Sequence, residues 1–182
     1  ESPWGNLAAD ALLKHMEADV AILMSGLLPE GLPQGEVTAG DLNRACFTTA
    51  NPYLSYLTGS QLVEALERAL DPEVCTRVVT SFRGPPVGFP QISGMQVAYQ
   101  KAGKVRSKIR EVLIHQTPLD PGKSYKVAHT DAEISANYGY FELAPGMESN
   151  ADVPTILPDV LAEYLINLDS SALPKPGRWV GI

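Results

Sequence analysis

Three histidines, His15, His115 and His129, are the residues of this sequence best suited to acid–base or metal chemistry. They lie far apart in the sequence and form no metal motif such as H-E-x-x-H. Only His129-Thr130-Asp131 forms a local cluster. Residues two apart on a strand face the same side, so His129 and Asp131 could share a ligand or a proton. We favour the alternative of a strand end at which the aspartate accepts backbone N–H groups.

A nucleophilic triad of Ser25, His129 and Asp131 is compatible with the sequence, because triads require geometry and not sequence order. However, no serine lies in a G-x-S-x-G elbow. The loop after Ser25 contains three glycines whose spacing matches neither a P-loop nor a dinucleotide fingerprint, so we expect them to be turn residues. These glycines are Gly26, Gly31 and Gly35.

Several aromatic residues near predicted loops offer surfaces on which a base or sugar could stack, although most such rings belong to a core. They are Phe47, Tyr53, Tyr56, Tyr138, Tyr140 and Phe141. Cys46 and Cys75 form neither a C-x-x-C pair nor a dense framework, so the redox compartment stays open. We expect both cysteines to be buried and to pack as small apolar residues.

The composition limits the classes of partner. The chain has 182 residues with 14 basic and 21 acidic side chains, a net charge of −7. Such an acidic chain lacks the electrostatic footprint of a nucleic-acid-binding protein. The apolar run Val20–Met24 is far shorter than the roughly 20 residues that span a bilayer, and the start lacks the features of a targeting signal. We therefore expect one domain over residues 1–182, with no nucleic acid and no membrane as partners.

The first half of the chain predicts alternating helices and strands. Apolar residues at three- and four-residue spacing predict a helix over about Gly5–Glu17, and Val20–Met24 reads as a central strand buried on both faces. A cap-like Thr38 precedes a short helix at Asp41–Ala45. Tyr53–Leu57 predicts a strand, which is followed by a helix that opens with a capping box of Thr58 and Gln61. These helices need a sheet to cover their apolar faces.

The second half is rich in strand signals. We predict a set of antiparallel strands from three signals. Apolar residues alternate with polar ones at Met95, Val97 and Tyr99, and β-rich runs follow at Lys108–Ile114 and Tyr125–Ala128. A final amphipathic helix is expected with Pro158 at its first position. The expected class is α+β, with mixed sheets and packed helices.

Seven segments, taken in order, resemble the C-terminal domain of the 5′-nucleotidase family. The opening Glu1 to Ala11 is similar to the signature E-x-x-x-G-N-L-x-A-D-A that starts that domain. Each remaining match is weak alone, but a chance match of all seven in family order is improbable. The other six are Asp19–Leu23, Val37–Leu42, Leu57–Leu62, Gln91–Gly94, the hairpin of Pro118–Pro121 with Tyr125–Ala128, and Pro176–Arg178.

The resemblance implies a function for the domain. In this family the C-terminal domain recognises the substrate, while a preceding calcineurin-like metallophosphatase domain holds two divalent metals and hydrolyses nucleotides or related phosphoesters. It therefore implies that this chain has a fold like that C-terminal domain, is covalently linked to a metallophosphatase domain outside this sequence, and is inactive alone. A small phosphoester would be the substrate, and a periplasmic or extracellular location is suggested.

The resemblance also points to substrate-binding positions, and several depart from the family pattern. After the first strand the family has an Asn-Gly-Gly loop that ends in an Arg. This chain has Ser25-Gly26 there and lacks both the Asn and the Arg. Phe47 takes the place of the first stacking ring with a one-residue insertion, and Thr48 takes it without one. Ala132 replaces the second ring, and the last loop lacks its Asp. The candidate substrate-binding residues are Ser25, Gly26, Phe47, Asn137, Tyr138, Gly139 and Tyr140.

These departures make ordinary purine nucleotides doubtful substrates. We expect a substrate other than a standard nucleoside monophosphate. The alternative is a degenerate domain of the same fold that is non-catalytic and serves as a structural or partner-binding module.

Overall fold

The computed structural model describes residues 1–182 except 79–85, 103–106, 135–138, 141–147 and 170–172. Its helices are α1 (Pro3–His15), the 3-10 turn η1 (Ser25–Leu27), α2 (Ala39–Ala45), α3 (Gly59–Ala69), α4 (Pro72–Cys75) and α5 (Leu157–Ile166). Its strands are β1 (Val20–Met24), β2 (Pro52–Thr58), β3 (Pro90–Ser93), β4 (Met95–Tyr99), β5 (Ile109–Ile114), β6 (Thr117–Pro118), β7 (Ser124–Thr130), β8 (Ser149–Ala151) and β9 (Trp179–Gly181).

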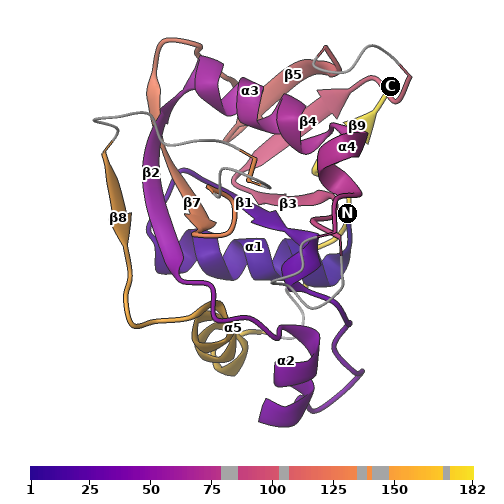
Figure 1. Ribbon diagram of the computed structural model, residues 1–182, viewed down its shortest axis with the longest axis vertical. Helices are drawn as coiled ribbons and strands as arrows, with labels where there is room; N and C mark the ends of the chain where they lie inside the picture. The colour runs from indigo at the N-terminus through magenta and orange to yellow at the C-terminus, as the bar shows by residue number, and fades with distance from the viewer. Residues whose placement is uncertain (79–85, 103–106, 135–138, 141–147, 170–172) are drawn as a thin grey trace.

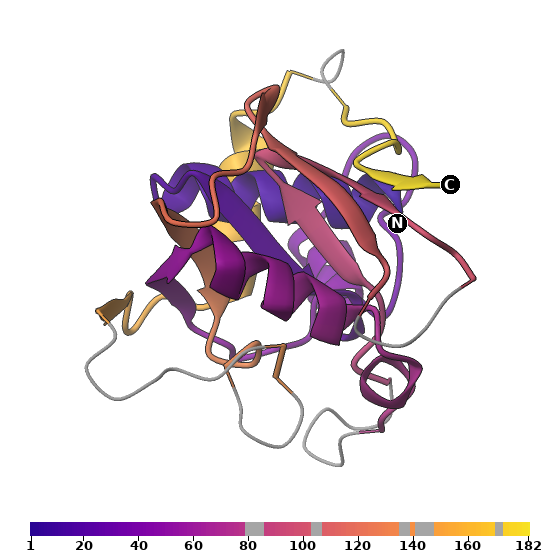
Figure 2. The ribbon, with the colours of Figure 1, turned by 90° about the horizontal axis from the view of Figure 1, so that it is seen from above.

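Two mixed sheets organise the molecule. The larger has the strand order β3-β1-β7-β2-β8, and the smaller has the order β6-β5-β4-β9. Helix α1 packs against β1 and β3, and α5 packs on α1. On the other side of the larger sheet, α3 contacts both β2 and β5 and so joins the two sheets (Figures 1 and 2). The predicted α+β class with mixed sheets is confirmed.

Local signals account for the helix starts and for the central strand. Thr58 and Gln61 form the predicted capping box at the start of α3. Thr38 caps α2 as predicted, and there it forms a full capping box with Asp41, so that α2 begins at Ala39, two residues before the predicted start. The side chain of Ser2 caps α1 by accepting the N–H of Gly5. All residues of β1 are buried, and β1 pairs with β3 on one side and β7 on the other, which confirms the predicted central strand.

The predicted antiparallel set is only partly correct. β4 pairs antiparallel with β5, but Tyr125–Ala128 lies in β7, which belongs to the other sheet. There β7 runs parallel to β1 and antiparallel to β2. The turn after β6 carries the chain from one sheet to the other. Helix α5 also begins one residue before Pro158.

The two ends of the chain are joined by a set of hydrogen bonds that we call the terminal clamp (Glu1, Asn6, Asp10 and Arg178). The Arg178 guanidinium lies 2.7 Å from an Asp10 carboxylate oxygen and donates to the carbonyl oxygens of Asn6 at 3.2 Å and Ile92 at 2.6 Å. The Glu1 carboxylate accepts the backbone N–H of Arg178 at 3.0 Å. The first and last family-like segments are therefore hydrogen-bonded to each other, and the termini lie close together (Figure 1).

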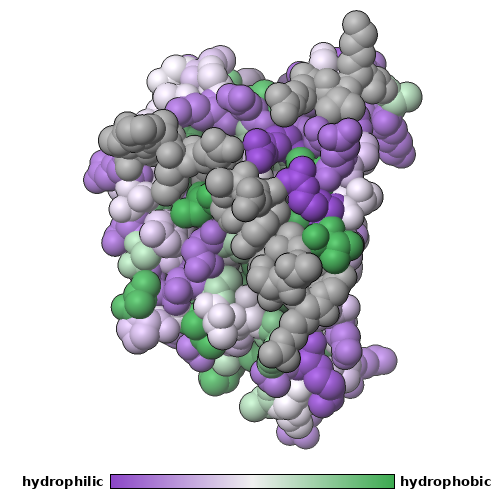
Figure 3. All heavy atoms as spheres, viewed as in Figure 1, coloured by the Kyte–Doolittle hydropathy of each residue, from purple (hydrophilic) through white to green (hydrophobic). Residues whose placement is uncertain are grey.

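None of the helices in the described part of the chain has the length and apolar character that a membrane span requires. On the face shown in Figure 3, outside the areas that grey atoms cover, hydrophobic residues are interspersed with hydrophilic ones. Cys46 is buried as predicted, and burial raises the pKa of its thiol to about 12. The prediction for Cys75 is wrong in degree, because this residue is only partly buried.

Candidate functional site

Three strand ends meet at one edge of the larger sheet. Since β1 and β7 are parallel and β2 is antiparallel to β7, the C-terminal ends of β1 and β7 lie beside the N-terminal end of β2. The topology therefore gathers Ser25 and Gly26 after β1, residues 47–50 before β2, and Asp131 and Ala132 after β7.

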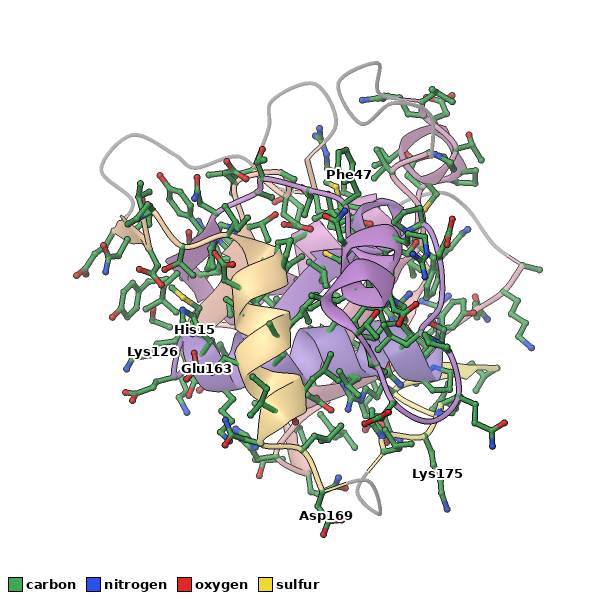
Figure 4. All side chains as sticks on the ribbon, turned by 90° about the horizontal axis from the view of Figure 1, so that it is seen from below. His15, Phe47, Lys126, Glu163, Asp169 and Lys175 are labelled. Atoms are coloured by element: carbon green, nitrogen blue, oxygen red, sulfur yellow. The ribbon has the colours of Figure 1, made fainter. Side chains whose placement is uncertain are left out.

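A cavity of about 2200 Å³ opens at this edge and extends between α2, α5 and the loop of residues 27–35. We call it the α2–α5 groove. Gly26, Phe47 and Ala132 line it together, although they are far apart in the sequence. Figure 4 shows α2 and α5 side by side on this side of the molecule, with Phe47 near one end of the space between them. The structure thus brings two of the sequence-predicted residues into one concave site.

The Ser25-Gly26 turn is fixed by close backbone packing. The N–H of Gly26 donates to the carbonyl oxygen of Val87 at 2.9 Å. A Cβ atom at Gly26 would lie 2.3 Å from the carbonyl oxygen of Pro86, so only glycine fits without a backbone shift. Gly88 has a φ of +81° and packs so closely on Ser25 that a Cβ there would meet the Ser25 hydroxyl at 2.1 Å. This loop is held rigidly next to the groove.

Phe47 stands at the groove with 62% of its surface exposed. It follows Cys46, the buried residue that caps the C-terminal end of α2. Thr48, the alternative position for the first ring, also lines the groove. A large exposed ring in a concave site is suited to stacking on a planar or apolar ligand group.

The remaining candidates lie elsewhere or are not described. Asn137 and Tyr138 fall outside the described residues. The carbonyl oxygen of Gly139 accepts a hydrogen bond from Arg68 at 2.8 Å. Tyr140 is fully buried, its hydroxyl donates to the carbonyl oxygen of Gly88 at 2.9 Å, and burial raises its pKa. Tyr140 is therefore a core residue in this structure and does not line the groove.

His129 is also a core residue. It is fully buried, and its Nδ1 lies 2.7 Å from the carbonyl oxygen of Thr130, which can only accept, so Nδ1 carries the proton. Its Nε2 then accepts from the hydroxyl of Ser55 at 2.8 Å. Burial lowers the pKa of His129 from 6.5 to about 4. The ring is neutral at physiological pH.

The possible cluster of His129 with Asp131 and Ser25 does not form in this structure. Both ring nitrogens of His129 are engaged, and its serine partner is Ser55 instead of Ser25. Asp131 lines the groove, and its backbone N–H donates to the carbonyl oxygen of Asn51 at 3.1 Å. Desolvation raises the pKa of its carboxyl. The favoured alternative is confirmed, because the Asp131 carboxyl takes part in hydrogen bonds with backbone groups that include that of Ala132. A second carboxylate, that of Glu133, accepts the N–H of Thr130.

Glu133 is the residue of the site that sequence reasoning missed. Its fully buried carboxylate accepts the backbone N–H groups of Met24 at 2.6 Å and Thr130 at 2.7 Å, and the hydroxyl of Thr130 at 2.5 Å. It therefore ties the end of β1 to the end of β7, directly before the residues that line the groove. Burial raises its pKa from 4.5 to about 7 despite these hydrogen bonds. The T-x-x-E spacing of a capping box was the available signal.

The described residues contain no group of three or more His, Cys, Asp or Glu side chains placed to hold a metal ion. The two-metal centre implied by the resemblance therefore does not fit the described residues of this chain, and we derive no chemistry through it here.

We expect the chain alone to show no metal-dependent hydrolysis of 4-nitrophenyl phosphate with Mn²⁺, Co²⁺ or Zn²⁺, because its acid–base groups are dispersed or buried. Absorbance at neutral pH measures the turnover. Turnover that persists through repurification and disappears in His129→Gln, with circular dichroism unchanged, would contradict this expectation.

Comparison with known proteins agrees with these features. The family model of the 5′-nucleotidase C-terminal domain matches residues 1–143. The chain is 26% identical over 167 residues to the uncharacterized metallophosphoesterase YunD of Bacillus subtilis, covering 91% of the chain and 35% of that protein. It is 23% identical over 184 residues to the trifunctional nucleotide phosphoesterase protein YfkN of the same organism, covering 96% of the chain and 12% of YfkN.

Solved structures share the fold. The 5′-nucleotidase precursor of Thermus thermophilus superposes with a TM-score of 0.83 at 20% identity, over 100% of this chain and 36% of that one. The chain thus spans about a third or less of the length of these similar proteins. With the family model matching well over half of its residues, the chain belongs to the 5′-nucleotidase C-terminal domain family.

Proposed function

We propose that this chain recognises the organic part of a small phosphoester within a 5′-nucleotidase-type metallophosphoesterase. The observation that carries the proposal is the groove at which Gly26, Phe47 and Ala132 converge from three separate segments. In the proposed enzyme an N-terminal metallophosphatase domain of the same polypeptide supplies two divalent metals and the hydrolysis. This chain supplies the shape and the contacts that select the substrate.

Two further observations support this division of labour. The similar proteins YunD and YfkN are named as phosphoesterases and are much longer than this chain. Gly26, held by close backbone packing, and the exposed Phe47 ring both line the groove, whereas Ser25 does not. A surface held in place in this way lowers the entropic cost of ligand binding. We place the enzyme in the periplasm or outside the cell, as the family suggests.

The alternative is a partner-binding module without catalysis. It is favoured by the charge of the groove, because the charged side chains among its described lining residues are all acidic, namely Glu30, Asp131 and Asp159. A phosphate group would not bind among them. In our proposal the phosphate lies outside the groove, toward the metal domain.

Phe47→Ala in the full-length polypeptide is expected to raise the KM for the best substrate about tenfold, since a stacking ring contributes about 1–3 kcal/mol. The kcat for 4-nitrophenyl phosphate, which has little to place in the groove, should stay within about twofold. The substrate panel would contain nucleoside, sugar and alkyl monophosphates, assayed with Mn²⁺ by phosphate release.

Val78→Ala is the matched control, because Val78 is also 62% exposed and does not line the groove. An unchanged KM in Phe47→Ala would reject the groove as the recognition site. Absence of any metal-dependent phosphoesterase activity in the full-length polypeptide would favour the partner-binding module.

A further inference from the structure

The α2–α5 groove is larger than a nucleoside requires. Its volume of about 2200 Å³ exceeds the roughly 300–1,000 Å³ typical of small-molecule pockets. Gly26, Phe47 and Ala132 account for only part of the lining. The rest continues along the loop of residues 27–35 and the facing sides of α2 and α5.

This extension is lined mainly by apolar side chains. Four of the eight large hydrophobic residues that are exposed in the described part of the chain line this one groove. They are Val37, Phe47, Ile166 and Leu173, with Ile166 83% exposed. A concentration of exposed apolar surface in one concavity marks a binding site more strongly than the same residues scattered singly.

The groove also has a definite electrostatic character. Glu30, Asp131 and Asp159 line it, and no Lys, Arg or His occurs among its described lining residues. The neighbouring Arg44 is paired with Asp41 and lines a small adjoining pocket, which shares residues 30–33 with the groove. Figure 4 places Lys126 beyond α5 and Lys175 toward the opposite end from Phe47. An anionic group at Asp131 or Asp159 would be repelled by these carboxylates, whereas a neutral or positive group would be tolerated or attracted.

We propose that the groove binds a long apolar chain without negative charge of its own, carried by the phosphoester substrate, and that it favours chains with a positive group. The proposal rests on the proposed function, and it names the class of substrate for that same site. The chain would lie along Phe47, Leu42 and Ile166, with its cationic end near the groove carboxylates. The phosphate would extend out of the groove.

A matched set of decyl compounds tests this, because they share one chain and differ in charge. The probes are decyltrimethylammonium, decyl maltoside and decyl sulfate, each below its micelle concentration, with adenosine and AMP as polar competitors. Binding to this chain would be followed by calorimetry and by NMR shifts of the Phe47 and Ile166 signals. We expect decyltrimethylammonium to bind at least tenfold more tightly than decyl sulfate, adenosine or AMP, with decyl maltoside in between.

The preference for the cation should shrink with added salt, because screening weakens the attraction to the carboxylates. Ile166→Lys places a positive charge on the groove wall and should lower the affinity for decyltrimethylammonium at least tenfold. Ile182→Lys is the matched control, since Ile182 is 66% exposed and does not line the groove, and it should leave binding unchanged. Both positions are exposed, so neither variant removes a core residue.

Other outcomes overturn the inference in distinguishable ways. Tightest binding of adenosine or AMP would overturn it and leave the proposed function standing. If decyl sulfate binds most tightly, the proposed preference for a positive group is wrong. If Ile166→Lys leaves binding unchanged, the chain does not bind in the groove. If no probe binds, the inference is overturned. If the chain is a dimer that Ile166→Lys dissociates in sedimentation, the groove is an interface between two copies of the chain. The Phe47→Ala kinetics then decide the proposed function separately.

Discussion

Between pH 4.5 and 7 the native chain is expected to lose about 3 kcal/mol of its free energy of unfolding through the titration of Glu133, and a Glu133→Gln variant is expected not to show this loss. In the native chain burial raises the pKa of Glu133 from 4.5 to about 7. The folded state therefore holds this proton more tightly than the unfolded state. The stabilisation is fully present below pH 4.5 and is lost as the pH rises through 7. Gln does not titrate, so the variant lacks this loss.

His129 has the opposite effect over nearly the same range. Burial lowers its pKa from 6.5 to about 4, so its contribution is present above pH 6.5 and is lost as the pH falls through 4. The two groups oppose each other, and the native chain should show little net dependence on them between pH 4.5 and 6.5. In Glu133→Gln only His129 remains to titrate, so the free energy of unfolding should rise by about 3 kcal/mol as the pH rises through this range. In His129→Gln only Glu133 remains, so the free energy of unfolding should fall by about as much.

Urea unfolding followed by circular dichroism at half-unit pH steps measures both trends. Each variant also loses a buried hydrogen-bond partner, which lowers its stability by about 1–3 kcal/mol at all pH values, so the slopes and not the absolute values carry the test. The double variant is the control and should be nearly independent of pH over this range. Parallel curves for the native chain and Glu133→Gln would show that Glu133 does not titrate as stated.

Arg178→Ala is expected to destabilise the chain by about 3 kcal/mol. The substitution removes the guanidinium contacts of the terminal clamp, so that Asp10 and the carbonyl oxygens of Asn6 and Ile92 lose this donor. The backbone N–H of residue 178 still donates to Glu1, and the Ser93 hydroxyl still donates to Asp10. The Arg178 side chain is only 20% exposed, so water replaces the lost contacts poorly. The measurement is again the free energy of unfolding in urea at neutral pH.

Arg44→Ala is the matched control, because Arg44 pairs with Asp41 on an exposed face, with 62% of its side chain accessible. Exposed pairs contribute about 0–1 kcal/mol, so this variant should change little. Arg178→Lys should recover only part of the lost stability, because an ammonium group cannot reproduce the planar fork that reaches Asp10, Asn6 and Ile92. Equal effects of Arg178→Ala and Arg44→Ala would show that the clamp does not stabilise the fold.

The sequence by itself determined the local elements. The cap residue Thr38, the capping box at Thr58 and the apolar run of β1 predicted two helix starts and the central strand. Such signals are set by residues a few positions apart. Ordered motifs also identified the family, and with it Gly26 and Phe47 as residues that the structure places together at one groove. Their role in binding stays a prediction.

Only the tertiary structure decided which distant residues meet. The β-rich run of β7 fits either sheet by its own pattern, and its pairing with β1 and β2 depends on long-range hydrogen bonds. The same pairing buries His129 beside Ser55 and brings Glu133 to Met24, 109 residues earlier in the chain. Arg178 likewise meets Asp10 only when the termini close. Burial and hydrogen-bond partners depend on the packing of the whole chain, and so local spacing does not specify them.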